Sequence, residues 1–119
     1  MPRTRSEAPE DAARARLVTA LVALEFGAQS LDLAQPDRRD PMTDFARQVA
    51  VYLLAQLTDM NLTRIGALFG RHRSTVAHSI RAVEDGRDDP GLDDTLDRLE
   101  TWLADILVDP SDDGLGEAA

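Results

Sequence analysis

The sequence contains neither cysteine nor lysine. Without cysteine, no disulfide framework and no cysteine-ligated zinc site can form, and this absence fits the reducing cytoplasm. Without lysine, a G-x-x-x-x-G-K-[ST] phosphate-binding loop is excluded. No stretch approaches the roughly 18 consecutive apolar residues of a membrane span, so we expect a cytoplasmic protein with no membrane partner.

The chain has 119 residues, 43% of them hydrophobic, which suffices for one small domain with a modest core. The first residues, MPRTRSEAPEDAARARL, include arginines but lack the apolar segment of a signal peptide. We expect a flexible leader over residues 1–9, a helical domain over 10–108 and a disordered acidic tail over 109–119.

The formal net charge of −9 is unevenly distributed, and all 13 basic residues are arginine. Residues 1–37 hold 4 arginines against 6 acids, residues 38–87 hold 8 against 5, and residues 88–119 hold 1 against 11. Phosphate neutralisation dominates non-specific binding to DNA, so an acidic chain is a poor candidate for that activity. A locally positive middle remains compatible with selective binding.

Apolar spacing predicts helices in the first half of the chain. A helix over about 10–26 follows from one set of residues: Leu17, Val18, Leu21, Val22 and Leu24. Gly27 is a natural stop, residues 30–35 suit a short helical turn, and Pro36 and Pro41 bound a loop. The next helix begins at Pro41 or Thr43 and runs to about 58, with a single apolar stripe: Phe45, Val49, Tyr52, Leu53 and Leu57.

The second half predicts two short helices across a tight turn. Asn61 or Thr58 can cap the first of them, and Gly70 suits the left-handed residue that ends a helix. A new helix over about 73–85 has Val76, Ile80 and Val83 on one face, and Gly86 closes it. Two such helices form a helix-turn-helix candidate.

A final helix is predicted from the leucine spacing after DDPGLDD, with this apolar stripe: Leu92, Leu96, Leu99, Leu103 and Ile106. It either packs on the long helix or joins a helix of a partner, and two heptads are short for an independent coiled coil. No run alternates with the period of a strand, so we expect an all-α domain.

The stretch FGRHRSTVAHS combines a Phe-Gly corner with basic side chains at the start of a helix. With the apolar face against the core, Ser74, His78 and Arg81 point to the opposite side, where small residues would let the helix enter a groove. Arg73 stands at the helix end that usually presents side chains to bases. The alternatives are a solvated turn, and a His78 that only bonds a backbone group or a phosphate.

Four motifs occur at fixed separations: ARQ at the start of the long helix, LT before the short one, IG-x-x-FG at the turn, and R-x-x-[ST]-T-V-x-H after it. The segment that contains them, ARQVAVYLLAQLTDMNLTRIGALFGRHRSTVAHSIRAVE, resembles the C-terminal DNA-binding domain of the bacterial replication initiator DnaA. The resemblance extends more weakly over about residues 15–108. It implies a Trp-repressor-like helix-turn-helix that reads a short DNA box, with the recognition helix in the major groove and a basic loop in the minor groove.

The resemblance and the exposed face of the recognition helix together give the candidate DNA-binding residues: Arg38, Arg39, Arg47, Gln48, Arg71, His72, Arg73, Ser74, Thr75, His78 and Arg81. Arg38 or Arg39 is implied for the minor groove, and Gln48 beside Arg47 for phosphate. The family usually has Asp-His where this chain has His72-Arg73, and its loop is more basic than PDRRDP. The identity of the recognised box is therefore open.

We expect no catalytic residues, no metal and no cofactor. Acids such as Asp93, Asp94 and Asp97 form a solvated helix face, and two histidines six residues apart do not meet as i and i+4 would. The leading hypothesis is sequence-specific binding to double-stranded DNA at DnaA-box-like sites without ATP hydrolysis, associated with the nucleoid and controlling replication initiation or transcription. The initiator would be an indirect partner through shared sites, and the oligomeric state is open, with a monomer favoured.

The alternative hypothesis is a protein-interaction module, in which the helical scaffold and the acidic C-terminal region bind a partner protein.

Overall fold

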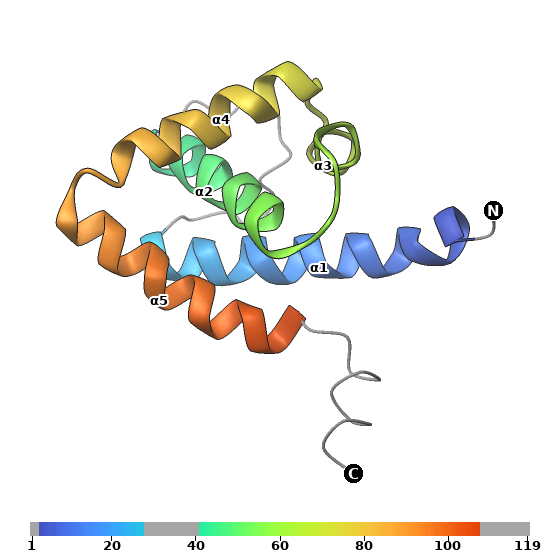
Figure 1. Cartoon of the computed structure of the whole chain (residues 1–119), viewed down its shortest axis with the longest axis horizontal. Coiled ribbons are helices and arrows are strands. Elements are labelled where there is room, and N and C mark those ends of the chain that lie inside the picture. Colours follow the sequence, from blue (N-terminus) through green and yellow to red (C-terminus); the bar gives the residue numbers. More distant parts are fainter. Residues whose placement is uncertain (1–2, 28–40, 108–119) are drawn as a thin grey trace, which may run out of the picture.

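The computed structural model describes residues 3–27 and 41–107 of the chain. These residues form five helices and no strand: α1 (Arg3–Phe26), α2 (Pro41–Leu57), α3 (Leu62–Phe69), α4 (Arg73–Gly86) and α5 (Pro90–Leu107). Helix α2 is the centre of the fold and contacts all four of the others, as Figure 1 shows. The all-α prediction is confirmed.

The central position of α2 follows from a sequence that is apolar on several faces. Val49, Ala50 and Leu53 are fully buried, and the small Ala46 and Ala50 allow neighbouring helices to approach closely. Pro41 is the first helical residue, a position where its missing N–H removes no helical hydrogen bond. Of the two predicted starts for this helix, the structure has Pro41.

Helix α1 buries a different side from the one its leucines suggested. Val18 and Val22 are fully buried, whereas Leu17 is 38% exposed and Leu24 is 78% exposed. Two apolar faces compete on this helix, and the valine face packs on α2. Gly27 follows the helix with φ +69°, which confirms the predicted stop.

The start of α1 also differs from the prediction. The helix begins at Arg3, whereas apolar spacing indicates a start near residue 10, so most of the expected leader has a helical backbone. The added residues include Arg, Glu and Ala, which form helices well but have no apolar periodicity to reveal them. Arg64 of α3 binds Asp11 (Nε to Oδ2, 3.0 Å), and this ion pair joins the N-terminal half of α1 to the helix-turn-helix.

Helices α3 and α4 form the predicted helix-turn-helix. Asn61 caps α3, because its side chain accepts a hydrogen bond from the N–H of Arg64 at 2.8 Å. Gly70 ends α3 in the left-handed conformation (φ 65°, ψ 36°), and the N–H of Arg71 then bonds the carbonyl of Gly66 at 2.8 Å. Gly66 has to be glycine, since a Cβ there would collide with the carbonyl oxygen of Arg71.

Helix α4 rests on the core through the predicted face. Val76 and Val83 are buried and Ile80 is partly buried against the same cluster. Ser79 is buried too, at the edge where α4 meets α2. This arrangement leaves the opposite face of α4 exposed, as the spacing predicts.

Helix α5 packs on α2 within the same molecule, which decides between the two predicted roles of its leucine stripe. Leu96, Leu99 and Leu103 are fully buried. The last apolar position was wrong: Ile106 is 54% exposed, and Leu107 enters the core in its place. The last buried residue of the stripe follows Leu103 by four positions, whereas the prediction placed it three positions after Leu103. No described helix is long and apolar enough to cross a membrane.

Arg87 closes the corner between α4 and α5. Its guanidinium donates to the hydroxyl of Tyr52 (2.8 Å) and to the carboxylates of Asp93 (2.6 Å), Glu100 (3.0 Å) and Asp97. Burial lowers the pKa of Arg87, but the hydrogen bonds to Asp93, Tyr52 and Glu100 outweigh it, and the pKa is raised overall. One arginine therefore ties the end of α4 to both α2 and α5.

Candidate nucleic-acid interface

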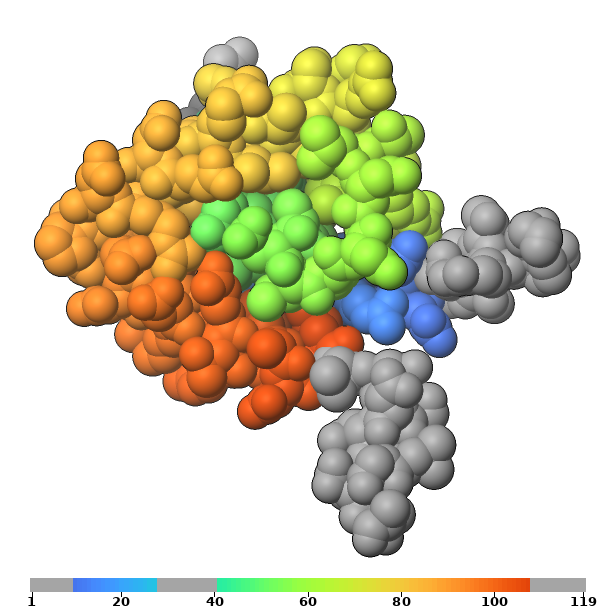
Figure 2. Space-filling model, viewed as in Figure 1, coloured from blue at the N-terminus to red at the C-terminus, as the bar shows by residue number. Residues whose placement is uncertain are grey.

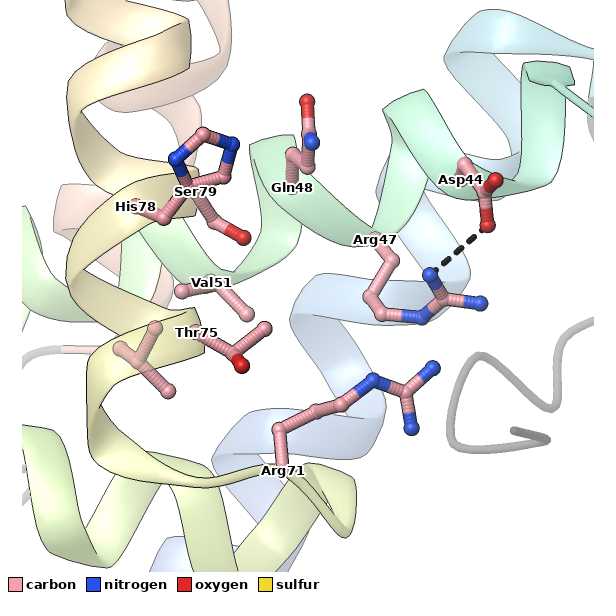
Figure 3. Close-up of a pocket in the computed structure, with 9 residues that line it drawn as sticks. Asp44, Arg47, Gln48, Val51, Arg71, Thr75, His78 and Ser79 are labelled. Carbon is pink, nitrogen blue, oxygen red and sulfur yellow. Dashed lines mark hydrogen bonds and ion pairs between the residues drawn. The ribbon is translucent and has the colours of Figure 1, made fainter.

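A pocket of about 200 Å³ lies where α2 passes the first half of α4. Figure 3 shows its lining side chains: Asp44, Arg47, Gln48 and Val51 from α2, and Arg71, Thr75, Val76, His78 and Ser79 from the turn and α4. Five of these residues were candidates from the sequence. The fold therefore brings together residues that are more than 20 positions apart in the chain.

Two guanidinium groups point toward the same side of this pocket, as Figure 3 shows for Arg47 and Arg71. Arg47 is only 9% exposed and binds Asp44 at 2.9 Å, while Arg71 donates to the carbonyl of Phe69 at 3.3 Å. Burial, and then the positive charge of Arg47, lower the pKa of Arg71, and Asp44 partly offsets them. Two neighbouring cations beside one partly exposed carboxylate favour the approach of an anion.

The start of α4 is exposed and rich in donors. His72 is the N-cap, with its Nδ1 accepting from the N–H of Ser74 at 3.1 Å. Arg73, Ser74 and Thr75 follow it and are all exposed. Within the described part of the chain, no hydrogen bond or ion pair holds the guanidinium of Arg73. The positive end of the helix dipole adds to the local positive potential.

The remaining candidates lie along the same side or outside the described residues. His78 lines the pocket next to Gln48, and both side chains reach its outer rim in Figure 3. Arg81 is exposed, one turn further along α4, and does not line the pocket. Arg38 and Arg39 fall in a segment that the structure does not describe, so the role in the minor groove stays a prediction.

Sequence reasoning missed two polar residues of this site. Asp44 holds Arg47 from the preceding helical turn, a spacing of three that the sequence does display. Ser79 is buried against α2, and its position next to the apolar stripe of α4 was the available signal.

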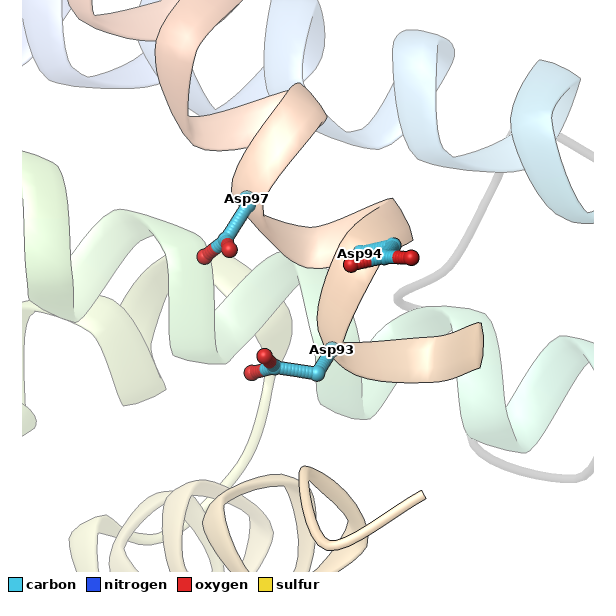
Figure 4. Close-up of side chains that lie close together, drawn as sticks. All are labelled: Asp93, Asp94 and Asp97. Carbon is cyan, nitrogen blue, oxygen red and sulfur yellow. The ribbon is translucent and has the colours of Figure 1, made fainter. Parts of the chain in front are cut away.

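The acidic residues of α5 gather on the other side of the molecule. Figure 4 shows Asp93, Asp94 and Asp97, each of which has a carboxylate oxygen within 4.8 Å of one on the other two. Arg87 binds two of the three, Asp93 and Asp97. Asp93 and Asp97 therefore belong to the ion pairs at the corner between α4 and α5.

The acidic helix does not cover the start of α4. Figure 2 shows α4 along one edge of the molecule and α5 along the opposite edge, with α2 between them. Among the described residues, the donor-rich end of α4 is thus exposed.

Curated relatives of the chain are replication initiators. The chain is 35% identical over 104 residues to the chromosomal replication initiator protein DnaA of Gloeobacter violaceus, a match that covers 86% of this chain and 22% of the relative. It is 38% identical over 66 residues to the DnaA of Tropheryma whipplei, and 43% identical over 68 residues to that of Bordetella pertussis. The latter two matches cover 52% and 56% of this chain and 14% of each relative, so the chain spans under a quarter of their length.

Solved structures share the fold. The replication initiator DnaA bound to AMPPCP and single-stranded DNA superimposes with a TM-score of 0.74 and 21% identity, over 90% of this chain and 33% of that one. A DNA replication initiation factor gives the same TM-score with 24% identity, over 87% of this chain and 32% of the other.

The family model of the bacterial dnaA protein helix-turn-helix matches residues 15–83. This region contains the buried valines of α1, all of α2 and α3, and α4 as far as Val83. The match covers more than half of the chain, and the chain therefore belongs to the bacterial DnaA helix-turn-helix family.

Proposed function

We propose that this chain binds double-stranded DNA at specific sites related to those of the DnaA family, by placing the start of α4 in the major groove. The observation that carries the proposal is the concentration of arginine at the start of α4. Arg73 is exposed and has no partner among the described residues, and Arg47 and Arg71 both line the pocket at this end of the helix. An exposed helix end with free donors is the part of a helix-turn-helix that reaches base edges.

The two arginines at the pocket are suited to a phosphate of the DNA backbone. Each guanidinium offers a planar fork of donors, and together they raise the local positive potential. Burial and then the repulsion from Arg47 lower the pKa of Arg71, and a phosphate between the two guanidiniums would offset both effects by stabilising the charged form. Gln48 at the rim adds an uncharged donor, and such backbone contacts fix the register of a protein on the duplex.

Along α4, the proposed reading face combines Arg73, Ser74, His78 and Arg81. Ala77 lies among them, and its small side chain allows the helix to settle deeply into a groove about 12 Å wide. Arg38 and Arg39 are proposed to reach the adjacent minor groove. Bases would be read from α4, and phosphates from α2 and the turn.

Selection from random duplexes tests this proposal directly. The full chain should enrich a motif of about ten base pairs, and its affinity for that motif should fall by roughly 0.9 log units per log unit of salt for each phosphate neutralised. If no sequence is enriched and the affinity is independent of salt, the chain is not a DNA-binding protein of this kind.

The biological role that follows is control of replication initiation or of transcription at shared sites, without ATP hydrolysis. Such a protein would compete with the initiator for DNA and need not touch it. A footprint over initiator boxes at an origin would favour the replication role, whereas a footprint confined to promoters would favour transcription.

A second candidate, a protein-interaction module, is favoured by one observation. Trp102 is 48% exposed and Ile106 is 54% exposed on the outer side of α5, among exposed acids such as Asp105. This candidate predicts that Trp102→Ala removes a protein partner while Arg73→Ala changes nothing. Sequence enrichment in the duplex selection would count against it as the main function.

A further inference from the structure

The N-cap of α4 is a histidine, and the cap determines which atom the ring presents outward. His72 has an extended backbone (φ −74°, ψ 152°), and its Nδ1 accepts from the N–H of Ser74 at 3.1 Å. The Ser74 hydroxyl lies 2.9 Å from the same nitrogen. Nδ1 is therefore occupied inside the molecule as the acceptor that a helix N-terminus requires.

This geometry fixes the tautomer of the neutral ring. One imidazole nitrogen carries the proton and the other accepts, so an accepting Nδ1 places the proton on Nε2. The ring is exposed, and its outward nitrogen is thus a hydrogen-bond donor. Ser, Asn and Asp, the residues that usually cap the N-terminus of a helix, have no ring nitrogen that could donate a hydrogen bond outward from this position.

The next residue also offers only donors. Arg73 is exposed, and its guanidinium has five N–H groups and no acceptor. No carboxylate among the described residues pairs with either side chain. Two adjacent positions at the outermost end of α4 therefore select for acceptors.

Base edges differ in what they offer to donors in the major groove. Guanine presents two neighbouring acceptors, O6 and N7. Adenine presents one acceptor beside a donor, thymine presents one acceptor beside its bulky methyl group, and cytosine presents a donor. Both purines share an N7 acceptor.

From this chemistry, and resting on the proposed DNA binding, we propose that His72 and Arg73 are specificity-determining residues that select two neighbouring purines. Arg73 holds the O6 and N7 of a guanine, and the Nε2–H of His72 donates to the N7 of the adjacent purine. Arg81 and His78 lie further along the helix and read other positions.

The experiment uses the selected duplex with single purines replaced by their 7-deaza analogues, which keep base pairing but have C–H in place of N7. One replaced guanine should weaken binding of the full chain about 2- to 10-fold, as the loss of one hydrogen bond does. Arg73→Ala should bind the modified and unmodified duplexes equally. Replacement of the adjacent purine should also weaken binding of the full chain, and a variant that lacks the ring of His72 should bind the modified and unmodified duplexes equally.

The His72 variants have to separate capping from reading. His72→Ser keeps a good N-cap acceptor but is too short to reach a base, so it should retain the helicity and melting temperature of the wild type and become insensitive to the adjacent 7-deaza purine. His72→Ala loses both the cap and the donor, and serves as the matched destabilised control.

The outcomes distinguish this inference from the proposed function. An enriched duplex that tolerates 7-deaza substitution at every purine would overturn the inference while leaving DNA binding intact. His72→Ser with the full sensitivity of the wild type would remove His72 from the reading residues. Failure to enrich any duplex would overturn both.

Discussion

The two ends of α4 use the same kind of residue in opposite ways. At its C-terminal end, Arg87 is 20% exposed and meets three carboxylates and a tyrosine hydroxyl, so its charge is satisfied within the protein. At its N-terminal end, Arg73 is exposed and no described residue pairs with it. All basic residues of the chain are arginine, so the number of charges does not distinguish a structural arginine from one that we propose for DNA binding. The partners of each guanidinium within the protein do.

This contrast also explains how an acidic protein can be a DNA-binding protein. Three carboxylates of α5, those of Asp93, Asp97 and Glu100, bind Arg87 at one corner, away from the start of α4 (Figures 1 and 2). Exposed charges further apart than about 10 Å are largely screened at moderate salt, so the local surface determines the interaction with a phosphate. The net charge of −9 describes the whole chain and not the face that we propose for DNA.

The largest effect is expected from a substitution that distorts the turn before α4 and changes no charged residue. Gly66→Ala places a Cβ against the carbonyl of Arg71, a backbone atom that cannot move aside without opening the turn. We expect a loss of about 3 kcal/mol in the free energy of unfolding, the upper range for overpacking. Urea denaturation measures it. Gly91→Ala is the control, because its Cβ would come no closer than 3.4 Å to another atom, the Oδ2 of Asp89.

The next largest effect is expected from the loss of Arg87, whose charge is satisfied within the protein at the C-terminal end of α4. Arg87→Ala leaves Asp93, Asp97 and Glu100 to repel one another and removes the link to Tyr52. Breaking a fully buried pair costs about 3 to 5 kcal/mol, and solvent screening of these partly exposed carboxylates reduces our expectation to about 2 kcal/mol.

The Arg87→Ala variant should prefer the same DNA sequences as the wild type, and to the same degree. Arg98→Ala, which loses an ion pair to Glu25 in a more exposed setting, should cost under about 1 kcal/mol. A change of sequence preference in Arg87→Ala would mean that the two ends of α4 are not independent.

The arginines at the pocket should contribute equally to binding of every sequence. Arg47→Ala and Arg71→Ala are each expected to lower affinity for the selected and for unrelated duplexes alike, and to reduce the slope of log affinity against log salt by about 1. Fluorescence anisotropy at several salt concentrations measures this. A loss confined to one sequence would place the arginine on a base and not on a phosphate.

The smallest effect is expected from the acidic tail. Residues 109–119 carry four carboxylates, so their removal should raise DNA affinity a few-fold at low salt, and less at high salt because the repulsion is screened. Unfolding should be unchanged. Equal affinities of the full and shortened chains would show that the tail does not oppose DNA binding.

Local signals in the sequence predicted most of the fold. Gly27, Asn61 and Gly70 stand where the structure has its caps, because capping depends on single residues and their immediate neighbours. Periodicity was less reliable where two faces of one helix are apolar, as Leu24 on α1 illustrates, and at the end of a stripe, where Leu107 of α5 is buried in place of Ile106. The pattern identifies candidate faces, and only the packing partner decides between them.

Long-range partners could not be predicted in the same way. The bond of Arg87 to Tyr52 spans 35 positions, and the bond of Arg64 to Asp11 spans 53, so nothing local distinguishes these arginines from Arg73. The candidate DNA-binding residues were predicted from a resemblance and from the exposed face of one helix. The inner wall of the pocket, with Asp44 and Ser79, depends on how α2 packs against α4, and no local pattern in the sequence shows that packing.

The most direct test of the contrast between the two ends of α4 is the affinity of Arg73→Ala for the selected duplex and for an unrelated one. We expect the ratio between these affinities to fall by roughly 10-fold, within the range for an arginine that reads a guanine, with the free energy of unfolding unchanged. An equal loss on both duplexes would contradict the account, and so would a variant that is destabilised as strongly as Arg87→Ala.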